Sequence, residues 1–194
     1  FNGGCQATTQ VSVVQTPKLV LKTPPAVCSP QTVDLTKLVD QSASILPPGT
    51  VFFYYLNNVQ VSTPSAVSQS GSYTINAVVP ANVQFGGCSD FQVVQVTINQ
   101  TPSITALQGP FCSSDASNHA LTASTPQNDF ITWNGDGVSN SGGTSFSFTP
   151  SLAGAGTHTL TATNFNGGCQ ATMQVSVLAP PSLSTCPADI IVSN

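Results

Sequence analysis

The stretch FNGGCQATTQVSV, residues 1–13, decides the fold because it recurs along the chain. Residues 165–177 read FNGGCQATMQVSV and differ only where Met173 replaces Thr9, and a looser copy, FGGCSDFQVVQVTI, occupies residues 85–98. Each copy is a Gly-Gly-Cys turn, then polar residues alternating with Val, Ile or Leu, then a proline. Alternation at period two is typical of a half-buried strand, so each copy is predicted to be the last strand of one repeat.

The spacing of the copies sets the domain organisation. Cys5, Cys88 and Cys169 stand 83 and 81 residues apart, a period too long for a solenoid unit and suited to one small β domain. The predicted parts are 1–15, the last strand of a preceding repeat; 16–99 and 100–178, two whole repeats; and 179–194, the start of a different domain. Turn signals divide each whole repeat into seven or eight short strands, which predicts an all-β fold of tandem sandwiches.

The composition excludes several classes of function. Only 5% of the residues are charged, against about 25% in an ordinary soluble domain. There is no Arg or Glu, and the only lysines are Lys18, Lys22 and Lys37. Nucleic-acid binding and a polybasic membrane patch both need many more cations. No apolar run reaches 18 residues, so no direct membrane insertion is expected.

Six cysteines favour disulfides and an oxidising compartment, and none has zinc-ligand spacing. One pairing scheme joins Cys28 to Cys88 and Cys112 to Cys169, which leaves Cys5 and Cys186 to neighbours outside this chain. The other scheme joins cysteines across repeat boundaries: Cys5 to Cys28, Cys88 to Cys112, and Cys169 to Cys186. The first is favoured because it keeps each repeat self-contained, but sequence does not fix connectivity.

Few residues are candidates for chemistry, and no catalytic set is predicted. His119 and His158 lie in or beside strands without a nucleophile signal and are interpreted as structural. Oxygen ligands for calcium would come from Asp115, Asp129, Asn134 and Asp136, but their spacing matches no calcium loop and turn geometry explains the Gly-Asp-Gly sequence. In the strand TVFFYYL, residues 50–56, one alternating aromatic pair is predicted to be core. The other pair, Phe52 and Tyr54, is the candidate for an exposed platform that stacks on sugars.

Two motifs of the second repeat resemble a known family. They are Trp133–Val138 (WNGDGV) and Phe148–Thr159 (FTPSLAGAGTHT), with the Gly167-Gly168-Cys169 turn after them. The chain resembles the PKD-like and immunoglobulin-like repeats of very large secreted surface proteins of gliding and related bacteria. The tail CPADIIVSN, residues 186–194, looks like the first strand of a HYR domain.

The resemblance implies a rod of sandwiches exported by type IX secretion to the bacterial cell surface, where such proteins are adhesins or their stalks, including gliding adhesins. It brings no catalytic residues and no cofactor. The predicted function is therefore a structural or adhesive repeat segment without enzyme activity. Its expected partners are neighbouring repeats, surface polysaccharide and secretion machinery. The alternative is a carbohydrate-binding accessory module of a secreted enzyme.

Overall fold

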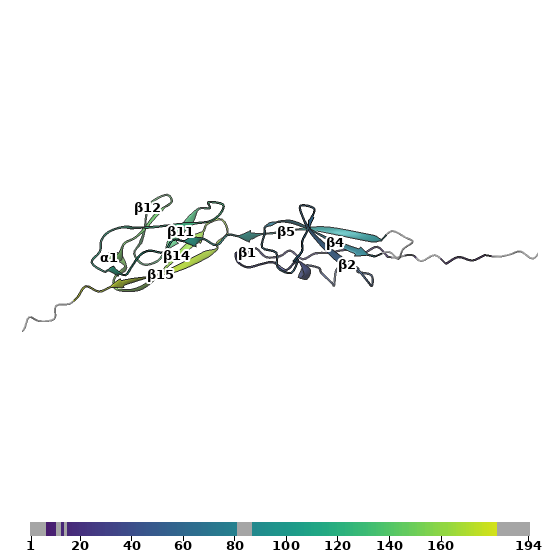
Figure 1. The fold of residues 1–194 in the computed structure, drawn as a ribbon, viewed down its shortest axis with the longest axis horizontal. Helices are drawn as coiled ribbons and strands as arrows, with labels where there is room; N and C mark the ends of the chain where they lie inside the picture. The colour runs from purple at the N-terminus through teal and green to yellow at the C-terminus, as the bar shows by residue number, and fades with distance from the viewer. Residues whose placement is uncertain (1–6, 11–12, 14, 81–86, 182–194) are drawn as a thin grey trace, which may run out of the picture. The chain divides into compact units, whose positions relative to one another are not determined.

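The computed structural model describes residues 7–10, 13, 15–80 and 87–181. The chain folds into two compact units, Phe1–Ile98 and Asn99–Asn194, called here the first and second unit. Strands make up nearly all regular structure in both (Figure 1). Cys5, Cys186 and most of the two predicted terminal pieces lie outside the described residues.

The first unit contains a regular four-stranded antiparallel sheet in the order β3-β2-β4-β5. Asn57 and Asn58 connect β2 to β3 with φ angles of 51° and 64°. These left-handed angles, which asparagine adopts more readily than most residues, belong to a type I′ hairpin turn. The strands are Val51–Leu56 (β2), Val59–Gln60 (β3), Gly71–Val79 (β4) and Cys88–Val96 (β5).

An irregular layer covers the inner face of this sheet. In it, β1 (Val27–Cys28) pairs with β6 (Ile98–Asn99), and isolated bridges join Lys18 to Ile45, Leu21 to Val39, and Val33 to Val67.

Residues 32–36 (TVDLT) alternate as a strand would, but they pair only at Val33, which bridges to Val67. Residues Leu35–Lys37 form the 3-10 helix η1, whose first turn is capped by Asp34. The Asp34 carboxylate accepts a hydrogen bond from the Thr36 backbone N–H at 3.0 Å, and this local bond competes with strand pairing.

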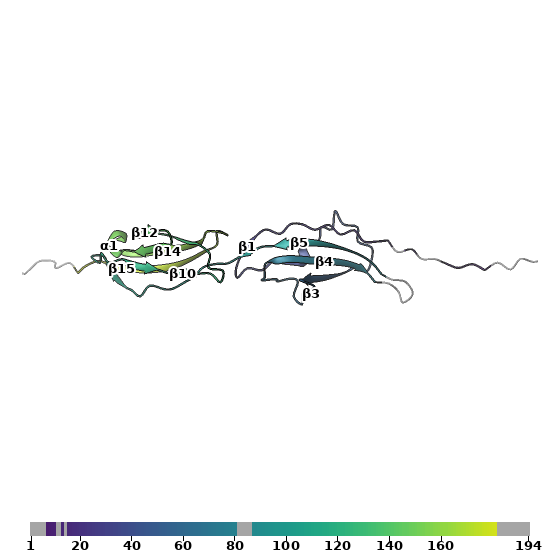
Figure 2. The same ribbon diagram turned by 90° about the horizontal axis from the view of Figure 1, so that it is seen from above.

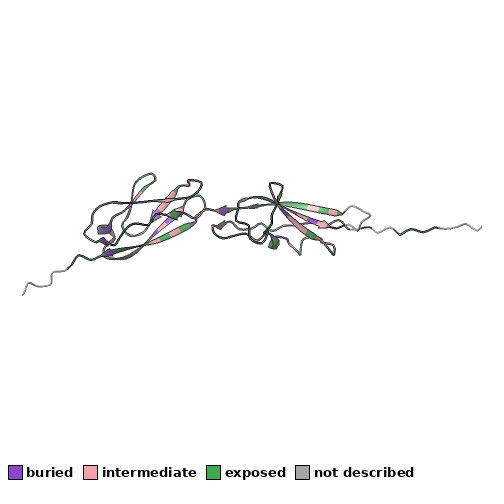
Figure 3. Ribbon diagram, viewed as in Figure 1, coloured by how far each residue is buried: buried purple, intermediate pink, exposed green. Residues whose placement is uncertain are grey.

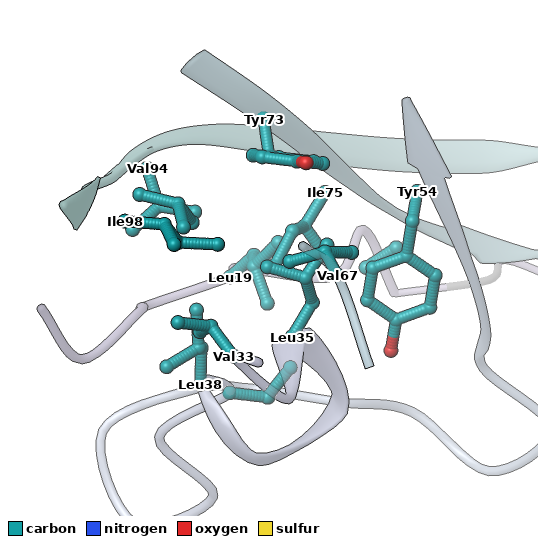
Figure 4. Close-up of a cluster of buried hydrophobic side chains, with 13 residues drawn as sticks. Leu19, Val33, Leu35, Leu38, Tyr54, Val67, Tyr73, Ile75, Val94 and Ile98 are labelled. Carbon is teal, nitrogen blue, oxygen red and sulfur yellow. The ribbon is translucent and has the colours of Figure 1, made fainter. Parts of the chain in front are cut away.

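The core of the first unit lies between its two layers (Figure 4). Tyr73 and Ile75 of β4 and Val94 of β5 meet Leu19 and Leu35 from the irregular layer. The spacing of the buried positions is two, so alternate residues of β4 are buried from Tyr73 to Val79. The intervening residues of β4 face outward, as Phe91, Val93 and Gln95 of β5 do, and exposed and partly buried stretches are visible along these strands in Figure 3.

The second unit is a two-layer sandwich. One sheet has the order β11-β14-β15-β8, the other has the order β12-β13-β9, and β7 pairs with β10 just after β9. The strands are Ser103–Ile104 (β7), Phe111–Cys112 (β8), His119–Leu121 (β9), Ala123–Ser124 (β10), Ile131–Asn134 (β11), Val138–Gly142 (β12), Ser145–Phe148 (β13), Gly156–Asn164 (β14) and Gln170–Leu178 (β15).

The strand order of the second unit is that of an immunoglobulin-like sandwich. Strands β11, β14 and β15 form one sheet, as strands C, F and G of that fold do, and β9, β12 and β13 form the other. Strand β8 adds to the first sheet in parallel with β15. Trp133 on β11 is buried against Phe148 and Leu160 in the core, where the immunoglobulin fold also carries a tryptophan.

Two connections of the second unit contain regular structure. The Gly-, Asn- and Ser-rich stretch 134–144 contains strand β12, which pairs with β13. The segment before Gly154 forms a helical turn, α1 (Pro150–Ala153), which begins at proline. Strand β12 reads VSNSG and shows no apolar alternation, so backbone pairing to β13 holds it and periodicity could not reveal it.

The two units are built on the same register. Each has a long antiparallel pair, β4–β5 or β14–β15 (Figure 2), and in the sequence the second strand of each pair begins at or just after Gly-Gly-Cys. Tyr73 pairs with Val94, and His158 pairs with Val175, which follows Cys169 at the same distance as Val94 follows Cys88. Tyr73 and His158 are therefore equivalent residues.

These equivalent residues make equivalent bonds. The Tyr73 hydroxyl donates to the Gln69 carbonyl at 2.8 Å, which is the tyrosine corner of immunoglobulin-like domains. His158 Nε2 donates to the Gly154 carbonyl at 2.9 Å, also four residues earlier in the chain. The imidazole thus does in the second unit what the phenol does in the first.

Candidate functional site

The aromatic strand β2 turns its side chains the opposite way from the prediction. Tyr54 is 9% exposed and belongs to the core, and Phe52 packs against it, so the predicted platform of Phe52 and Tyr54 is wrong. Figure 4 shows Tyr54 projecting from its strand toward the other core residues. Burial raises the pKa of its hydroxyl. Period two gives a strand two faces but does not say which one is inside, and here Tyr54 pairs with the fully buried Ile75.

Phe53 and Tyr55 consequently lie on the outer face of the sheet, where two further apolar side chains join them. Phe53, Asn76 and Phe91 form one row across β2, β4 and β5. Tyr55, Thr74 and Val93 form the next row. Phe91 is 63% exposed and Val93 is 57% exposed. The aromatic face is defined here as Phe53, Tyr55, Asn76, Phe91 and Val93.

Polar groups on the aromatic face carry no formal charge at neutral pH. Asp90 of β5 points the other way, and its carboxylate accepts a hydrogen bond from the Leu19 backbone N–H at 2.7 Å. Among the described residues, Asn76 Oδ1 is the one buried side-chain polar atom without a hydrogen-bond partner. A shielded acceptor without a donor costs free energy, so Asn76 is not placed on this face for the sake of stability.

The second unit has a polar surface at the same place. Asn134, Thr161 and Thr172 form the row that corresponds to Phe53, Asn76 and Phe91. Thr159 and Gln174 correspond to Thr74 and Val93. Hydroxyl and amide groups therefore replace the aromatic rings on an otherwise equivalent sheet. We call this surface the threonine face.

The cysteines do not follow the favoured scheme. Cys28 and Cys169 are disulfide-bonded, but Cys112 is an exposed thiol, with Sγ 3.0 Å from the Ser114 hydroxyl oxygen. The hydrogen bond from the Ser114 hydroxyl lowers the pKa of this thiol. A Cys112–Cys169 pair and a Cys88–Cys112 pair are therefore both wrong for this structure.

Strand geometry explains why pairing within a unit fails. Cys112 pairs with Leu178 at the end of β15, whereas Cys169 immediately precedes its start. At about 3.4 Å per residue, nine residues separate the two cysteines by roughly 30 Å, far beyond the reach of a disulfide. Cys28 and Cys88 stand in the same relation, because β1 pairs beside Thr97 and β5 begins at Cys88.

The acidic residues considered for calcium lie in separate hydrogen-bond groups. Asp129 accepts from Thr125 Oγ1 at 3.0 Å, Asn164 Nδ2 at 2.9 Å and Asn166 Nδ2 at 3.0 Å. The Asn166 bond contributes most to the lowered pKa of Asp129. Within the described ranges, no three His, Cys, Asp or Glu side chains gather as a metal site would require.

Asp115 and Asp136 each contact a histidine. Asp115 Oδ2 lies 2.9 Å from His119 Nε2, and the bond from the Ser117 backbone contributes most to the lowered pKa of Asp115. Asp136 Oδ2 lies 3.2 Å from His158 Nδ1. With its other nitrogen bonded to a carbonyl and a side chain only 10% exposed, His158 fixes two loops together and presents no free base.

The surface depressions offer no catalytic set either. An open depression beside β3 is lined by Val59, Val61, Thr63 and Tyr73, with no acid, histidine or cysteine. Another, beside β11, contains Asp129, whose oxygens are already engaged. In the described part of the chain, no helix has the length and apolar character of a membrane span.

No family model matches the chain, and no curated protein is similar enough to count as a relative. Solved structures of immunoglobulin domains resemble it at low identity. An I-band fragment of titin is 13% identical with a TM-score of 0.44, covering 86% of this chain and 66% of that one. Sidekick-1 immunoglobulin domains 1–5 are 10% identical with a TM-score of 0.43, covering 86% and 39%. The insect immune protein hemolin is 11% identical with a TM-score of 0.44, covering 89% and 49%. The chain spans less than two thirds of each of these structures.

Proposed function

We propose that this chain is a non-catalytic, adhesive and structural segment of a large secreted protein at a bacterial cell surface. The main observation in support of this proposal is the repetition of one strand motif. The motif occurs three times in the sequence, and in both units it forms the last long strand of a sheet in the same register. A protein that needs reach and contact is well served by tandem domains that each have a core of their own.

Three further observations support this assignment. Disulfide-bonded Cys28 and Cys169 fit an oxidising compartment such as the cell exterior. A surface that is poor in charge and built of Ser, Thr, Asn and Gln offers few sites to trypsin-like proteases. The histidines and carboxylates of the described residues are engaged in local structural bonds rather than directed at a shared cleft.

The resemblance of Trp133–Val138 and Phe148–Thr159 to repeats of gliding-type adhesins makes the proposal more specific. It suggests type IX secretion, a HYR-like domain after residue 178, and neighbouring repeats as the first partners. The tandem organisation favours an extended array, which small-angle scattering of the purified chain tests directly. A scattering profile of one merged globule would contradict the array.

The decisive experiment uses the cells that make the protein. Antibodies raised against this chain should label intact, unpermeabilised cells, and deleting the coding region for these two units should reduce attachment of the cells to surfaces. The purified chain should hydrolyse no glycan or peptide substrate. Labelling only after permeabilisation would overturn the proposed location, and unchanged attachment would overturn the adhesive role.

A further inference from the structure

The aromatic face is not explained by folding. Phe91 and Val93 are mostly exposed, and the second unit builds the same sheet with Thr172 and Gln174 in their places. The N-terminal copy of the motif also carries polar residues there, Thr8 and Gln10. A fold that tolerates threonine and glutamine at these positions does not need phenylalanine and valine. Contiguous exposed apolar side chains of this kind mark interaction sites.

The register gives the face a defined spacing. Phe53 and Phe91 lie in one row on strands that are two apart, with Asn76 between them. Neighbouring strands are about 4.8 Å apart, so the two phenylalanines start roughly 10 Å apart on the sheet. That separation is comparable with the length of a disaccharide. Tyr55 and Val93 continue the apolar surface into the next row.

The chemistry of the face selects the ligand. The rings of Phe53 and Phe91 flank the amide of Asn76, whose oxygen lacks a donor, and Thr74 adds a hydroxyl. At the end of the face, the Ser72 hydroxyl donates a hydrogen bond of 2.7 Å to Gln95 Oε1. Because no charge lies on this surface, a charged ligand would find no counter-charge to offset its desolvation. Pyranose rings offer an apolar face to aromatic side chains and hydroxyl donors at their edges.

We propose that the aromatic face of the first unit binds a neutral polysaccharide. Sugar rings stack on Phe53, Phe91 and Tyr55, and sugar hydroxyls contact the uncharged polar side chains of the same face. The inference rests on the proposed adhesive function, and it specifies the class of ligand and the surface that binds it. The threonine face of the second unit does not bind this ligand, because it has no ring to stack on.

The test uses the full 194-residue chain, with laminarin, xyloglucan and galactomannan as neutral probes and alginate as the charged one. Affinity electrophoresis should show retardation by at least one neutral probe and none by alginate, and calorimetry then gives the affinity. Phe53→Asn and Phe91→Thr install the residues of the second unit. Each change should weaken binding about three- to tenfold, the equivalent of the usual worth of one aromatic contact.

Three variants separate ring stacking from general effects of substitution. Phe91→Tyr should keep binding and Phe91→Leu should weaken it, because stacking needs a ring and not only an apolar group. Phe165→Thr removes a phenylalanine from the second unit that is 71% exposed, slightly more than Phe91, and should leave binding unchanged. Circular dichroism confirms that each variant is folded before binding is measured.

Several results would overturn the proposal: no retardation by any neutral probe, full binding by the Phe53→Asn/Phe91→Thr variant, or equal loss in Phe165→Thr. Sedimentation that shows a dimer of the chain, dissociated by the same double variant, would assign the face to a second copy instead. Antibody labelling of intact cells does not depend on these substitutions. The proposed cell-surface location is therefore tested independently of the proposed ligand.

Discussion

The aromatic face of the first unit and the threonine face of the second occupy the same place on equivalent sheets. Phe53, Asn76 and Phe91 stand where Asn134, Thr161 and Thr172 stand, and most of the inner residues of the same strands are apolar in both units. The inner face is fixed by the need to bury apolar surface, whereas the outer face is free to change. Two repeats can therefore share a fold and differ in what they contact.

The largest loss of stability is expected from a substitution on the inner face. Trp133→Ala should lower the free energy of unfolding of the second unit by about 3–5 kcal/mol, since a buried aromatic ring is lost and a cavity remains. Phe53→Asn, one strand position away from the equivalent inner residue Phe52, should cost the first unit only about 1 kcal/mol, because Phe53 is half-buried on the outer face. Differential scanning calorimetry measures both, and equal losses would remove the distinction between the two faces.

The next effect concerns Cys169 and Cys112 of the second unit. Cys169→Ser should cost about 2–4 kcal/mol because it removes a disulfide, and Cys112→Ser should cost under about 0.5 kcal/mol because it changes an exposed thiol. Trp133, the single tryptophan, reports unfolding of this unit in denaturant. A large cost for Cys112→Ser would mean that its thiol is bonded in solution, which non-reducing peptide mapping would reveal.

A smaller effect is expected at the corner of the first unit. Tyr73→Phe removes the hydroxyl that donates to the Gln69 carbonyl and should cost about 1 kcal/mol. Tyr55→Phe, on the outer face of the neighbouring strand, makes the same chemical change and should cost almost nothing. Thermal unfolding followed by circular dichroism compares them, and similar midpoints for both variants would show that the corner bond does not stabilise the unit.

Acid should weaken the second unit through Asp129. Bonds from Asn166, Thr125 and Asn164 lower the pKa of its carboxyl in the folded state. The folded state then binds fewer protons than the unfolded state, so this stability is fully present above the unfolded value of about 3.9 and is lost as the pH falls below it. Asp129→Asn should be less stable than the native chain at neutral pH, and the gap should close in acid. A gap that is independent of pH would exclude the carboxylate as the cause.

The smallest change in stability is expected when outer-face residues of the first unit are replaced by those of the second. Phe91→Thr with Val93→Gln gives the first unit the residues of the second and should alter its unfolding free energy by less than about 0.5 kcal/mol. Tyrosine fluorescence reports this unit, because Tyr54, Tyr55 and Tyr73 all lie in it. A loss as large as that of a core residue would show that the aromatic face serves folding.

The sequence was sufficient for the repeat, the all-β class and the long terminal strands. Val94 and Val96 alternate as Val175 and Val177 do, and alternation reports burial directly. The sequence also contains evidence for the aromatic face that the sequence analysis did not use. When the Gly-Gly-Cys motifs are aligned, Phe91 corresponds to Thr172 and Val93 corresponds to Gln174. Apolar residues in only one copy of an outward position indicate a surface feature.

Tertiary structure alone decided which aromatic residues were inside and which cysteines could meet. Phe52 through Tyr55 read equally well in either orientation, and only the pairing of Tyr54 with buried Ile75 assigns the inner face. Cys112 and Cys169 look like partners in the sequence, but β15 holds them at its opposite ends. The local pattern gives the period of the side chains but not which face of the strand is buried. The buried face, and the distance between two cysteines, are set only when strands from separate parts of the chain pair.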